Sequence, residues 1–292
     1  MDISFLIVTK NRPDELRYTL SRLQNLVTID KHEVLVFIDG CVATQALVTE
    51  FGWVKWTVWN HSISASPARA ILYQKAVGTI FIGLDDDAHP VSADFSSKVQ
   101  QYFETNPQRG ILAFQEVKGI YPTDDLALLQ AKNKTSFYTN DFVGCGFAIA
   151  KKVYAITNGF PTWIDIYGEE SCVAYEVLDA GYTIYFAHDI VVNHRIDIEK
   201  RKLQGKNYFR FERQLRNSFK LYLVYYPNPL PVIARLLFHN FKRYACTDFV
   251  FFKLYWRAVG HMIVGLFDTL QYRSPIQKKT LKAIQKLKNM PY

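Results

Sequence analysis

Apolar residues near the start of the chain form short runs that alternate with segments of helical spacing. Each run has the length and the β-branched residues of a buried strand, which predicts strands at residues 3–9, 33–39, 53–59 and 79–84. Leucines at positions 16, 20, 23 and 26 follow the spacing of one helix face. Ser66 and Pro67 resemble a cap and a first-turn proline, which predicts a second helix to about residue 76. Such alternation predicts an α/β fold with a mostly parallel sheet and helices on both faces.

After residue 90 the pattern is less regular. It predicts a helix at 93–103, a strand at 111–115, a long loop at 119–140, a strand at 142–150, a helix at 168–180 and a strand at 182–187. Beyond His194 the apolar positions have helical spacing, which is interrupted at the prolines of residues 227–231. The sequence therefore divides into an α/β region at 1–195 and a helical region at 196–292.

Polar residues follow directly after three of the predicted strands. Ligands in such sheets bind beyond the carboxyl ends of the strands, so these residues are candidates for a site. They are Thr9, Asn11 and Arg12 after the first strand, Asp39 after the second, and Asp85, Asp86, Asp87 and His89 after the fourth.

The run from Asp85 to Asp87 carries the clearest chemistry. Three consecutive carboxylates repel one another, and their hard oxygen atoms suit Mg²⁺ or Mn²⁺, which can also bridge a diphosphate. His89 lies two residues further on and offers an imidazole as a local ligand. A solvated acidic turn is the alternative, and the position at the end of a buried strand favours the metal site.

Four weaker candidates each have a structural alternative. Asp39 can accept hydrogen bonds from a base or ribose, or belong to an ordinary Asp-Gly turn. Arg69 can pair with a phosphate or with a surface carboxylate. Glu169 and Glu170 precede a predicted helix, where a carboxylate can offset the helix dipole or act as a general base. His194 ends a strand and belongs to the site only if it reaches the same pocket.

Composition excludes several classes of protein. The 49% hydrophobic and 15% aromatic residues argue against disorder. The four cysteines form no C-x-x-C pair, so buried free thiols in a reducing compartment are expected. The first residues do not read as a signal peptide, and the most apolar stretch, residues 249–270, is interrupted by charges and is expected to be amphipathic or buried. Dinucleotide, P-loop and G-x-S-x-G motifs do not occur.

The order of these segments closely resembles the family-2 glycosyltransferases with a GT-A fold. The resemblance is carried by FLIVTKNRP, EVLVFIDG, SPARA, FIGLDDD, FVGCGFAIAKKVY, NGFPTWIDIYGEES and AGYTIYFAHDIVVNH, within about residues 3–195. The family implies a nucleotide-sugar donor, Mn²⁺ or Mg²⁺, and inverting transfer to a hydroxyl acceptor, here in bacterial-type surface glycan or polysaccharide biosynthesis.

Carried over by position, the resemblance also implies roles for individual residues. Thr9, Asn11 and Arg12 would line the nucleotide pocket, Asp39 would bind the base or ribose, and Arg69 would bind the nucleotide or its phosphates. Asp85, Asp86 and Asp87 take the place of the DxD motif, with Asp85 at the ribose or metal, Asp86 on the donor side and Asp87 on the metal. His194 would reach the metal or diphosphate. Glu169 and Glu170 replace the family's Glu-Asp pair, and Glu170 matches the general base, with Glu169 left open as the alternative.

The net charge of +8 is the sum of an acidic first part and a basic second part of the chain. Residues 1–194 hold 15 Lys and Arg against 22 Asp and Glu, whereas residues 195–292 hold 20 against 5. Bases interleaved with aromatic residues are typical of helices at an anionic membrane surface, and family members with lipid-linked acceptors often carry such a region. We therefore expect a glycan or lipid-linked acceptor and a cytoplasmic protein, peripheral on the inner face of the membrane. A solvated helical face ranks second, and nucleic acid, which attracts the same composition, is not expected.

Two other functions remain as alternatives. One is a non-catalytic scaffold at the membrane that keeps the GT-A-like fold, and the intact acidic motifs argue against it. The other is a nucleotidyltransferase, which also uses a metal and an α/β sheet, although no lysine-rich glycine loop near residue 1 favours it.

Overall fold

The computed structural model describes residues 1–203 and 205–291. These residues form a nine-stranded sheet of order β3-β2-β1-β4-β8-β6-β9-β5, with β7 paired to β9 beside it. The strands β1 to β4 pair in parallel, whereas β8 runs antiparallel to both β4 and β6, so the sheet is mixed. The strands are β1 (Ile3–Thr9), β2 (His32–Asp39), β3 (Lys55–Trp59), β4 (Ile80–Asp85), β5 (Ala88–Pro90), β6 (Arg109–Lys118), β7 (Phe137–Thr139), β8 (Gly146–Ala150) and β9 (Thr183–His194).

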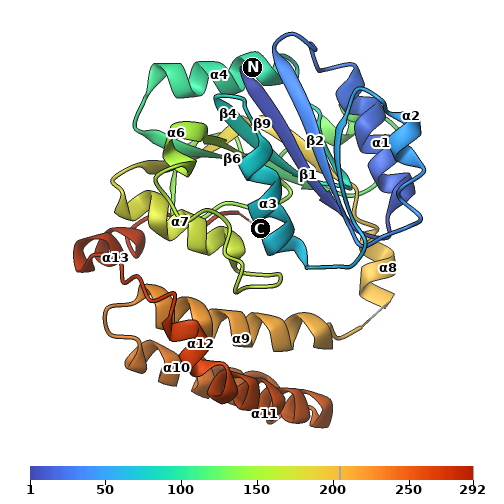
Figure 1. The fold of residues 1–292 in the computed structure, drawn as a ribbon. Helices are drawn as coiled ribbons and strands as arrows, with labels where there is room; N and C mark the ends of the chain where they lie inside the picture. The colour runs from blue at the N-terminus through green and yellow to red at the C-terminus, as the bar shows by residue number, and fades with distance from the viewer. Residues whose placement is uncertain (204, 292) are drawn as a thin grey trace.

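Helices cover both faces of the sheet, because successive side chains of a strand point to opposite sides. Ile3, Phe5 and Ile7 of β1 share a core with α1 (Pro13–Gln24) and α4 (Phe95–Thr105). Leu6 instead shares a core with the helices of the other face, α3 (Ala65–Lys75), α6 (Lys151–Tyr154) and α7 (Glu169–Asp179). Figure 1 shows this sheet and its helices as the upper part of the molecule.

The predicted elements of residues 1–194 are found, with shifted ends. Strands β6 and β9 extend further than expected because they pair out to Lys118 and His194. The strand predicted at 142–150 forms only from residue 146, since residues 142–145 line a cleft instead of pairing. The predicted loop at 119–140 contains β7 and α5 (Asp124–Leu128), and a short α2 (Leu47–Glu50) precedes β3.

The remaining helices follow β9, and all but the first and the last of them form a layer below the sheet in Figure 1. They are α8 (Ile198–Leu203), α9 (Tyr208–Tyr225), α10 (Leu230–Asn240), the π-helical turn η1 (Phe241–Ala245), α11 (Phe249–Val264), α12 (Leu266–Leu270) and α13 (Lys278–Ile284). The proline-rich break expected at 227–231 separates α9 from α10. After α13 the chain returns to the upper part, where Thr139 Oγ1 donates to the Lys288 carbonyl at 2.9 Å and Met290 joins the core.

Two further expectations concern the cysteines and the membrane. Cys41, Cys145 and Cys172 are buried as expected, but Cys246 is exposed because it follows η1 at the edge of the helical layer. Within residues 1–203 and 205–291, none of the helices combines the length and apolar character needed to cross a membrane. The stretch at 249–270 accordingly forms two helices of the lower layer.

Candidate active site

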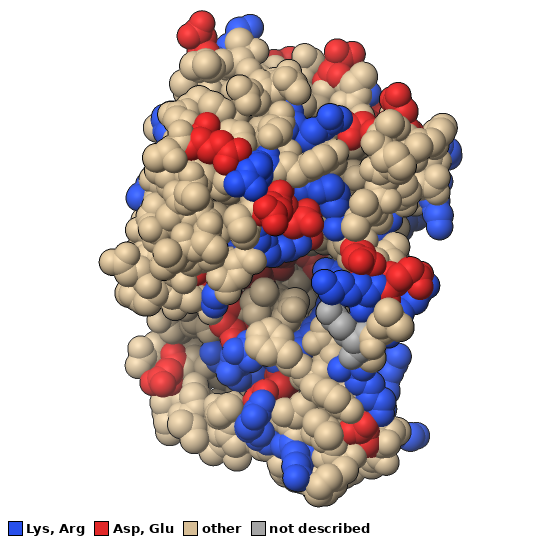
Figure 2. All heavy atoms as spheres, turned by 90° about the vertical axis from the view of Figure 1, so that its right-hand side faces the viewer, with Lys and Arg blue, Asp and Glu red and all other residues tan. Residues whose placement is uncertain are grey.

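A cleft of about 1420 Å³ separates the carboxyl ends of the central strands from α9. Asp85, Asp87 and His194 line it from the sheet, and Asn207 and Arg210 line it from α9. Figure 2 shows the cleft as a hollow in the middle of the molecule, with acidic and basic side chains around it. Its position is the one in which open α/β sheets bind ligands.

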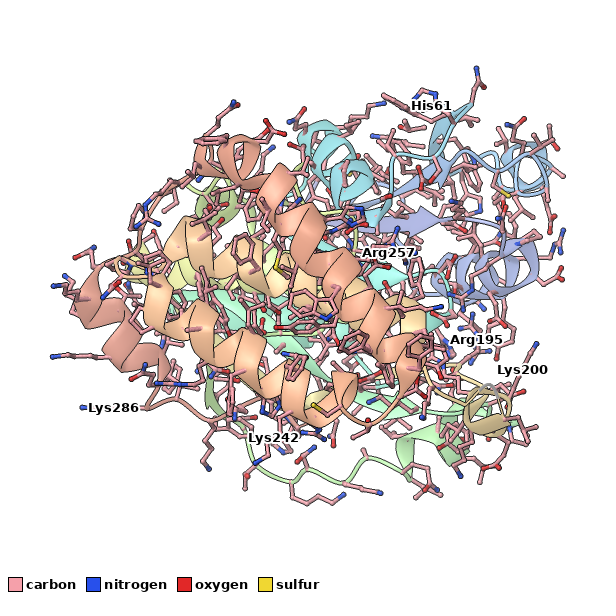
Figure 3. The ribbon with its side chains drawn as sticks, turned by 90° about the horizontal axis from the view of Figure 1, so that it is seen from below. His61, Arg195, Lys200, Lys242, Arg257 and Lys286 are labelled. Atoms are coloured by element: carbon pink, nitrogen blue, oxygen red, sulfur yellow. The ribbon has the colours of Figure 1, made fainter. Side chains whose placement is uncertain are left out.

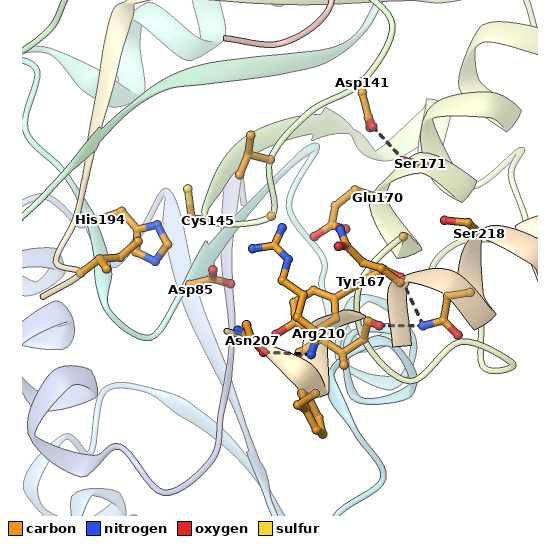
Figure 4. Close-up of a pocket in the computed structure, with 18 of the residues that line it drawn as sticks. Asp85, Asp141, Cys145, Tyr167, Glu170, Ser171, His194, Asn207, Arg210 and Ser218 are labelled. Atoms are coloured by element: carbon orange, nitrogen blue, oxygen red, sulfur yellow. Dashed lines mark hydrogen bonds between the residues drawn. The ribbon is translucent and has the colours of Figure 1, made fainter. Parts of the chain in front are cut away.

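Asp85, Asp87 and His194 come together although His194 is distant in sequence. Strand β5 follows the three aspartates directly and pairs with the end of β9, which sets Ala88 opposite His194. The ligand atoms of Asp85, Asp87 and His194 lie within 4.8 Å of one another. His194 Nε2 is 3.2 Å from Asp87 Oδ1, and its Nδ1 is 2.6 Å from Glu116 Oε1. Figure 4 shows His194 and Asp85 on the same side of the cleft.

Cations offset the burial of these carboxylates. Burial by itself would raise the pKa of Asp87, but the contact with His194 and the charges of His194 and Arg12 hold that pKa well below its usual range. Burial raises the pKa of Asp86 to about 7, and repulsion from Asp87 adds to this while Arg12 opposes it. For His194, burial is outweighed by bonds to Asp87, Cys145 and Glu116, which raise its pKa to about 12. The cluster therefore holds positive charge close to its carboxylates.

The same donor set fits a divalent cation. Two carboxylates and an imidazole converge, a combination that suits Mn²⁺, and the carboxylates also suit Mg²⁺. Within the described residues, Asp87 Oδ1 has no well-aligned hydrogen bond and meets only the His194 ring, whereas Oδ2 pairs with Arg12. Asp87 would therefore ligate a cation through Oδ1 while Oδ2 keeps its pair with Arg12.

Arg69 connects the floor of the cleft to α7. It is buried, and its Nη2 donates to Asp85 Oδ1 at 2.9 Å while its Nη1 donates to Glu169 and Glu170 at 3.0 and 3.1 Å. Burial opposes the charge, yet the three carboxylates keep the pKa of Arg69 above its usual value. Gly144 permits this approach, because a Cβ there would clash with Glu170 Oε1 and lie 2.9 Å from Arg69 Nη2. Arg69 thus fixes Asp85 relative to the two glutamates.

Glu169 and Glu170 begin α7 but have different environments. Glu170 lines the cleft, whereas Glu169 is 2% exposed and its Oε2 has no hydrogen-bond partner within the described chain. Burial, together with the charge of Glu170, raises the pKa of Glu169 well above its usual range. Glu170 is the carboxylate placed to meet a ligand, as Figure 4 shows.

Four further residues predicted for the site, Thr9, Asn11, Asp39 and Asp86, do not line the cleft. Thr9 Oγ1 donates to Asp86 Oδ2 at 2.8 Å, below the cluster. Asp39 accepts three hydrogen bonds from residues 62–64, so it fixes the loop after β3. Asn11 is exposed and has a φ of 58°, a left-handed conformation that Asn tolerates.

His89 does not act as the local imidazole expected beside Asp87. Its Nδ1 accepts a hydrogen bond from Arg195 at 2.7 Å, and its Nε2 lies 3.1 Å from Asp124 Oδ1. Burial, helped by the charge of Arg195, lowers the pKa of His89 to about 3. Both nitrogens of the ring are thus engaged by Arg195 and Asp124, outside the cluster around Asp87. His194 supplies the imidazole near Asp87 instead.

Glu116, Asp141 and residues of α9 also line the cleft, and none of them was predicted from the sequence. Glu116 follows the strand predicted at 111–115, so inspection of every strand end would find it. Asp141 lines the cleft and accepts a hydrogen bond from Ser171 Oγ at 2.8 Å, and no local pattern marks it. The α9 residues are brought in by long-range packing, which composition does not reveal.

Helix α9 is tied to the loop that precedes α7. Asp165 accepts from Arg213 Nε and Arg216 Nη2, both at 2.8 Å, and from Asn217 Nδ2 at 3.0 Å. Burial would raise the pKa of Asp165, but the hydrogen bond from Asn217 and the charge of Arg216 lower it. Several bases of the helical region therefore bind the protein itself rather than facing outwards.

Comparisons with solved structures show that this fold is GT-A-like. No protein-family model matches the sequence, and no curated protein matches it. The chain is similar to GalNAc-T7 in complex with UDP, GalNAc and Mn²⁺, at a TM-score of 0.62 and 15% identity, over 80% of this chain and 49% of GalNAc-T7. It is similar to the mannosyltransferase PcManGT from Pyrobaculum calidifontis in complex with GDP-Man and Mn²⁺, at 0.57 and 14%, over 97% of this chain and 83% of PcManGT. It is also similar to residues 1–349 of TarS from S. aureus, at 0.59 and 13%, over 97% of this chain and 83% of that one.

Proposed function

We propose that the protein is an inverting, metal-dependent glycosyltransferase, which moves a sugar from a nucleotide-sugar donor to a hydroxyl of a glycan or lipid-linked acceptor in surface glycan or polysaccharide biosynthesis. The observation that carries the proposal is the convergence of Asp85, Asp87 and His194 in the same cleft as Glu170. The fold supports it, since two similar structures hold UDP or GDP-Man together with Mn²⁺. Residues 1–195 would form the catalytic region.

On the donor side, Asp85, Asp87 and His194 would hold Mn²⁺ or Mg²⁺. Such a metal, when bound, stabilises the negative charge of a leaving diphosphate. Arg12 is 42% exposed at its side chain, so it can turn from the carboxylates towards phosphate oxygens. Arg69 would keep Asp85 in place. Thr9, Asn11, Asp39 and Asp86 would bind the nucleotide or support that end of the cleft.

On the acceptor side, Glu170 would act as the general base, with the buried Glu169 as the alternative. As the acceptor oxygen forms its bond to the anomeric carbon, its proton passes to the Glu170 carboxylate and the bond to the diphosphate oxygen breaks. Attack from the face opposite the leaving group inverts the anomeric centre, and a single base is sufficient. Arg69, 3.1 Å from Glu170 Oε1, orients that base.

A donor screen followed by two variants tests this proposal. Thermal shift with MnCl₂ and a panel of nucleotide-sugars identifies the donor, whose metal-dependent hydrolysis and transfer are then measured. Asp87→Ala should lower hydrolysis at least about 100-fold, and Glu170→Ala should keep donor binding but lower transfer by about 10²–10⁴. Asp125→Ala, an exposed carboxylate outside the cleft, serves as the control.

Two outcomes would contradict the proposal. Calorimetry that finds no Mn²⁺-dependent binding of nucleoside diphosphates would favour a scaffold. Formation of a nucleotide-sugar from a sugar phosphate would identify a nucleotidyltransferase instead.

We also propose that the helical region at 196–292 docks on an anionic membrane surface, with the protein cytoplasmic and peripheral on the inner face. Helix α11 supports this because it has two apolar sides. Phe251 and Tyr255 are buried among the other helices, whereas Phe249 and Ile263 are 69% exposed and Trp256 is 52% exposed on the opposite stripe. Such a stripe is typical of interfacial helices when bases accompany it.

The exposed bases around it include Arg235, Lys242, Arg243 and Lys253. Figure 3 views this layer from below, with α10 and α11 in front.

A further inference from the structure

The main cleft adjoins a second cavity beyond Glu170. This cavity has a volume of about 490 Å³ and shares Asp141, Ser171 and Tyr175 with the cleft. Ser171 is the residue after Glu170 on α7, and Tyr175 lies one turn further along the same face. The two cavities are therefore neighbours, and these three side chains mark the path from the carboxylate of Glu170 to the second cavity.

The far wall of the second cavity comes from the end of the chain. Ile284, Asn289 and Met290 line it, opposite Asn140. This wall is held in place, because Asn140 Nδ2 donates to Asn289 Oδ1 at 2.9 Å and Met290, 4% exposed, packs in the core. The end of the chain, which is far from Glu170 in sequence, thus lines a cavity that lies near Glu170 in the fold.

The side chains along this path have the chemistry that binds a saccharide. Asp141 accepts a hydrogen bond from the Ser171 hydroxyl at 2.8 Å and faces the cleft, as Figure 4 shows. Burial, helped by the charge of Glu170, raises the pKa of Asp141 to about 7, so near neutral pH this carboxyl both donates and accepts hydrogen bonds. Tyr175 and, from α9, Tyr222 add aromatic rings, against which the apolar faces of a sugar can pack. A volume near 490 Å³ lies within the range of small-molecule sites.

Resting on the proposed function, we infer that this path is the acceptor subsite and that it takes a saccharide whose hydroxyl groups are oriented by Asp141 and Ser171. Ile284, Asn289 and Met290 form its outer wall. The reacting hydroxyl then sits beside Glu170, while the rest of the saccharide extends towards Asn289. The subsite binds the acceptor independently of the nucleotide, which lies at the sheet end of the cleft.

Saturation-transfer NMR on the full chain, with the diamagnetic MgCl₂ and UDP or GDP present, tests the inference. The probes are glucose, galactose, mannose, N-acetylglucosamine, maltose, lactose and chitobiose. Asn289→Trp fills the second cavity from an exposed position, and Gln285→Trp, exposed and outside the lining, is its matched control. Asp141→Asn removes the carboxylate but keeps its size. We expect at least one saccharide to bind the wild type and the Gln285 variant, and to lose about 10-fold in signal with the other two variants.

The failure of this inference can be told apart from failure of the proposed function. Nucleoside diphosphate affinity, measured by calorimetry with Mn²⁺, should stay within about twofold in all the variants. Saccharide signals that persist in Asn289→Trp and Asp141→Asn, or the absence of saccharide binding to a wild type that binds the nucleotide, would overturn the acceptor subsite alone. Absence of nucleotide binding to the wild type would count against the donor site instead.

Discussion

The geometry of Glu170 depends on residues that no local pattern joins. Arg69 donates hydrogen bonds to Asp85 and to Glu170, so a single guanidinium fixes the positions of the two carboxylates relative to each other. Gly144 leaves the space for this contact. In the sequence, Gly144 lies in the segment FVGCGFAIAKKVY and belongs to no dinucleotide fingerprint, so its importance comes from the missing side chain rather than from a motif.

Gly144→Ala should therefore impair transfer while the fold is kept. The added Cβ would clash with Glu170 Oε1 and press on Arg69, so both side chains must shift. A misplacement of about 1 Å at a catalytic group can cost about 100-fold in rate, and we expect a loss of that order in kcat. The measurement is transfer at saturating donor, with circular dichroism to confirm the fold.

Gly52→Ala provides the matched control for this substitution. A Cβ at Gly52 meets nothing within 4 Å, so its activity should equal that of the wild type. Wild-type kcat in Gly144→Ala would show that the Arg69–Glu170 contact is not needed for transfer.

At the scale of elements, α9 shows why charge composition was an incomplete guide. The bases of residues 196–220 suggested an outward-facing surface, but Arg213 and Arg216 bind Asp165 and Lys220 donates to the Trp163 carbonyl at 2.6 Å. The number of charged residues does not say which way their side chains point, whereas packing turns one face of each helix towards the interior of the protein. The presence of the strands and the polar residues that follow them were predictable because their signals are local. The closure of the cleft by α9 was not, because it depends on contacts between distant segments.

The Asp165 cluster predicts a pH-dependent contribution to stability. Its carboxyl pKa is lowered in the folded state, so its contribution is present above the ordinary Asp pKa of about 3.9 and is lost as pH falls through the lowered value. At pH 7, Asp165→Asn should reduce the free energy of unfolding by about 1.5–3 kcal/mol, the range for hydrogen bonds to charged groups. The difference from wild type should shrink below about pH 4. Urea unfolding at pH 7, 5 and 3.5 measures it.

Asp30→Asn, at an exposed position, is the control for the same chemical change. An equal loss of stability in both variants, or a difference for Asp165→Asn that stays constant down to pH 3.5, would contradict the role of this cluster.

At the scale of the whole molecule, the split in charge at residue 194 coincides with a change of architecture. Strand β9 ends at His194, and the described residues after it form helices joined by turns, apart from a bridge between Thr139 and Lys288. The two parts are nevertheless interdependent, since α9 forms one wall of the cleft and Ile284, Asn289 and Met290 border the second cavity. Periodicity predicted the two architectures. It did not predict that they share a site, because the sheet end and α9 meet only through tertiary packing.

The outward stripe of α11 predicts binding to anionic vesicles. The wild type should float with vesicles of phosphatidylcholine and 30% phosphatidylglycerol on a density gradient, because aromatic side chains enter the interface while Lys242 and Lys253 meet the lipid charge. Phe249→Ser with Trp256→Ser should reduce the floated fraction several-fold, since both residues are more than half exposed and their loss leaves the buried side of α11 intact. Ile29→Ser, at a side chain 70% exposed on the sheet part, should float like the wild type. Raising the salt to 0.5 M should weaken flotation through screening of the bases. Equal flotation of the double variant and the wild type, or no flotation of the wild type, would remove the membrane from the proposed function and leave the transfer chemistry to be judged by Asp87 and Glu170.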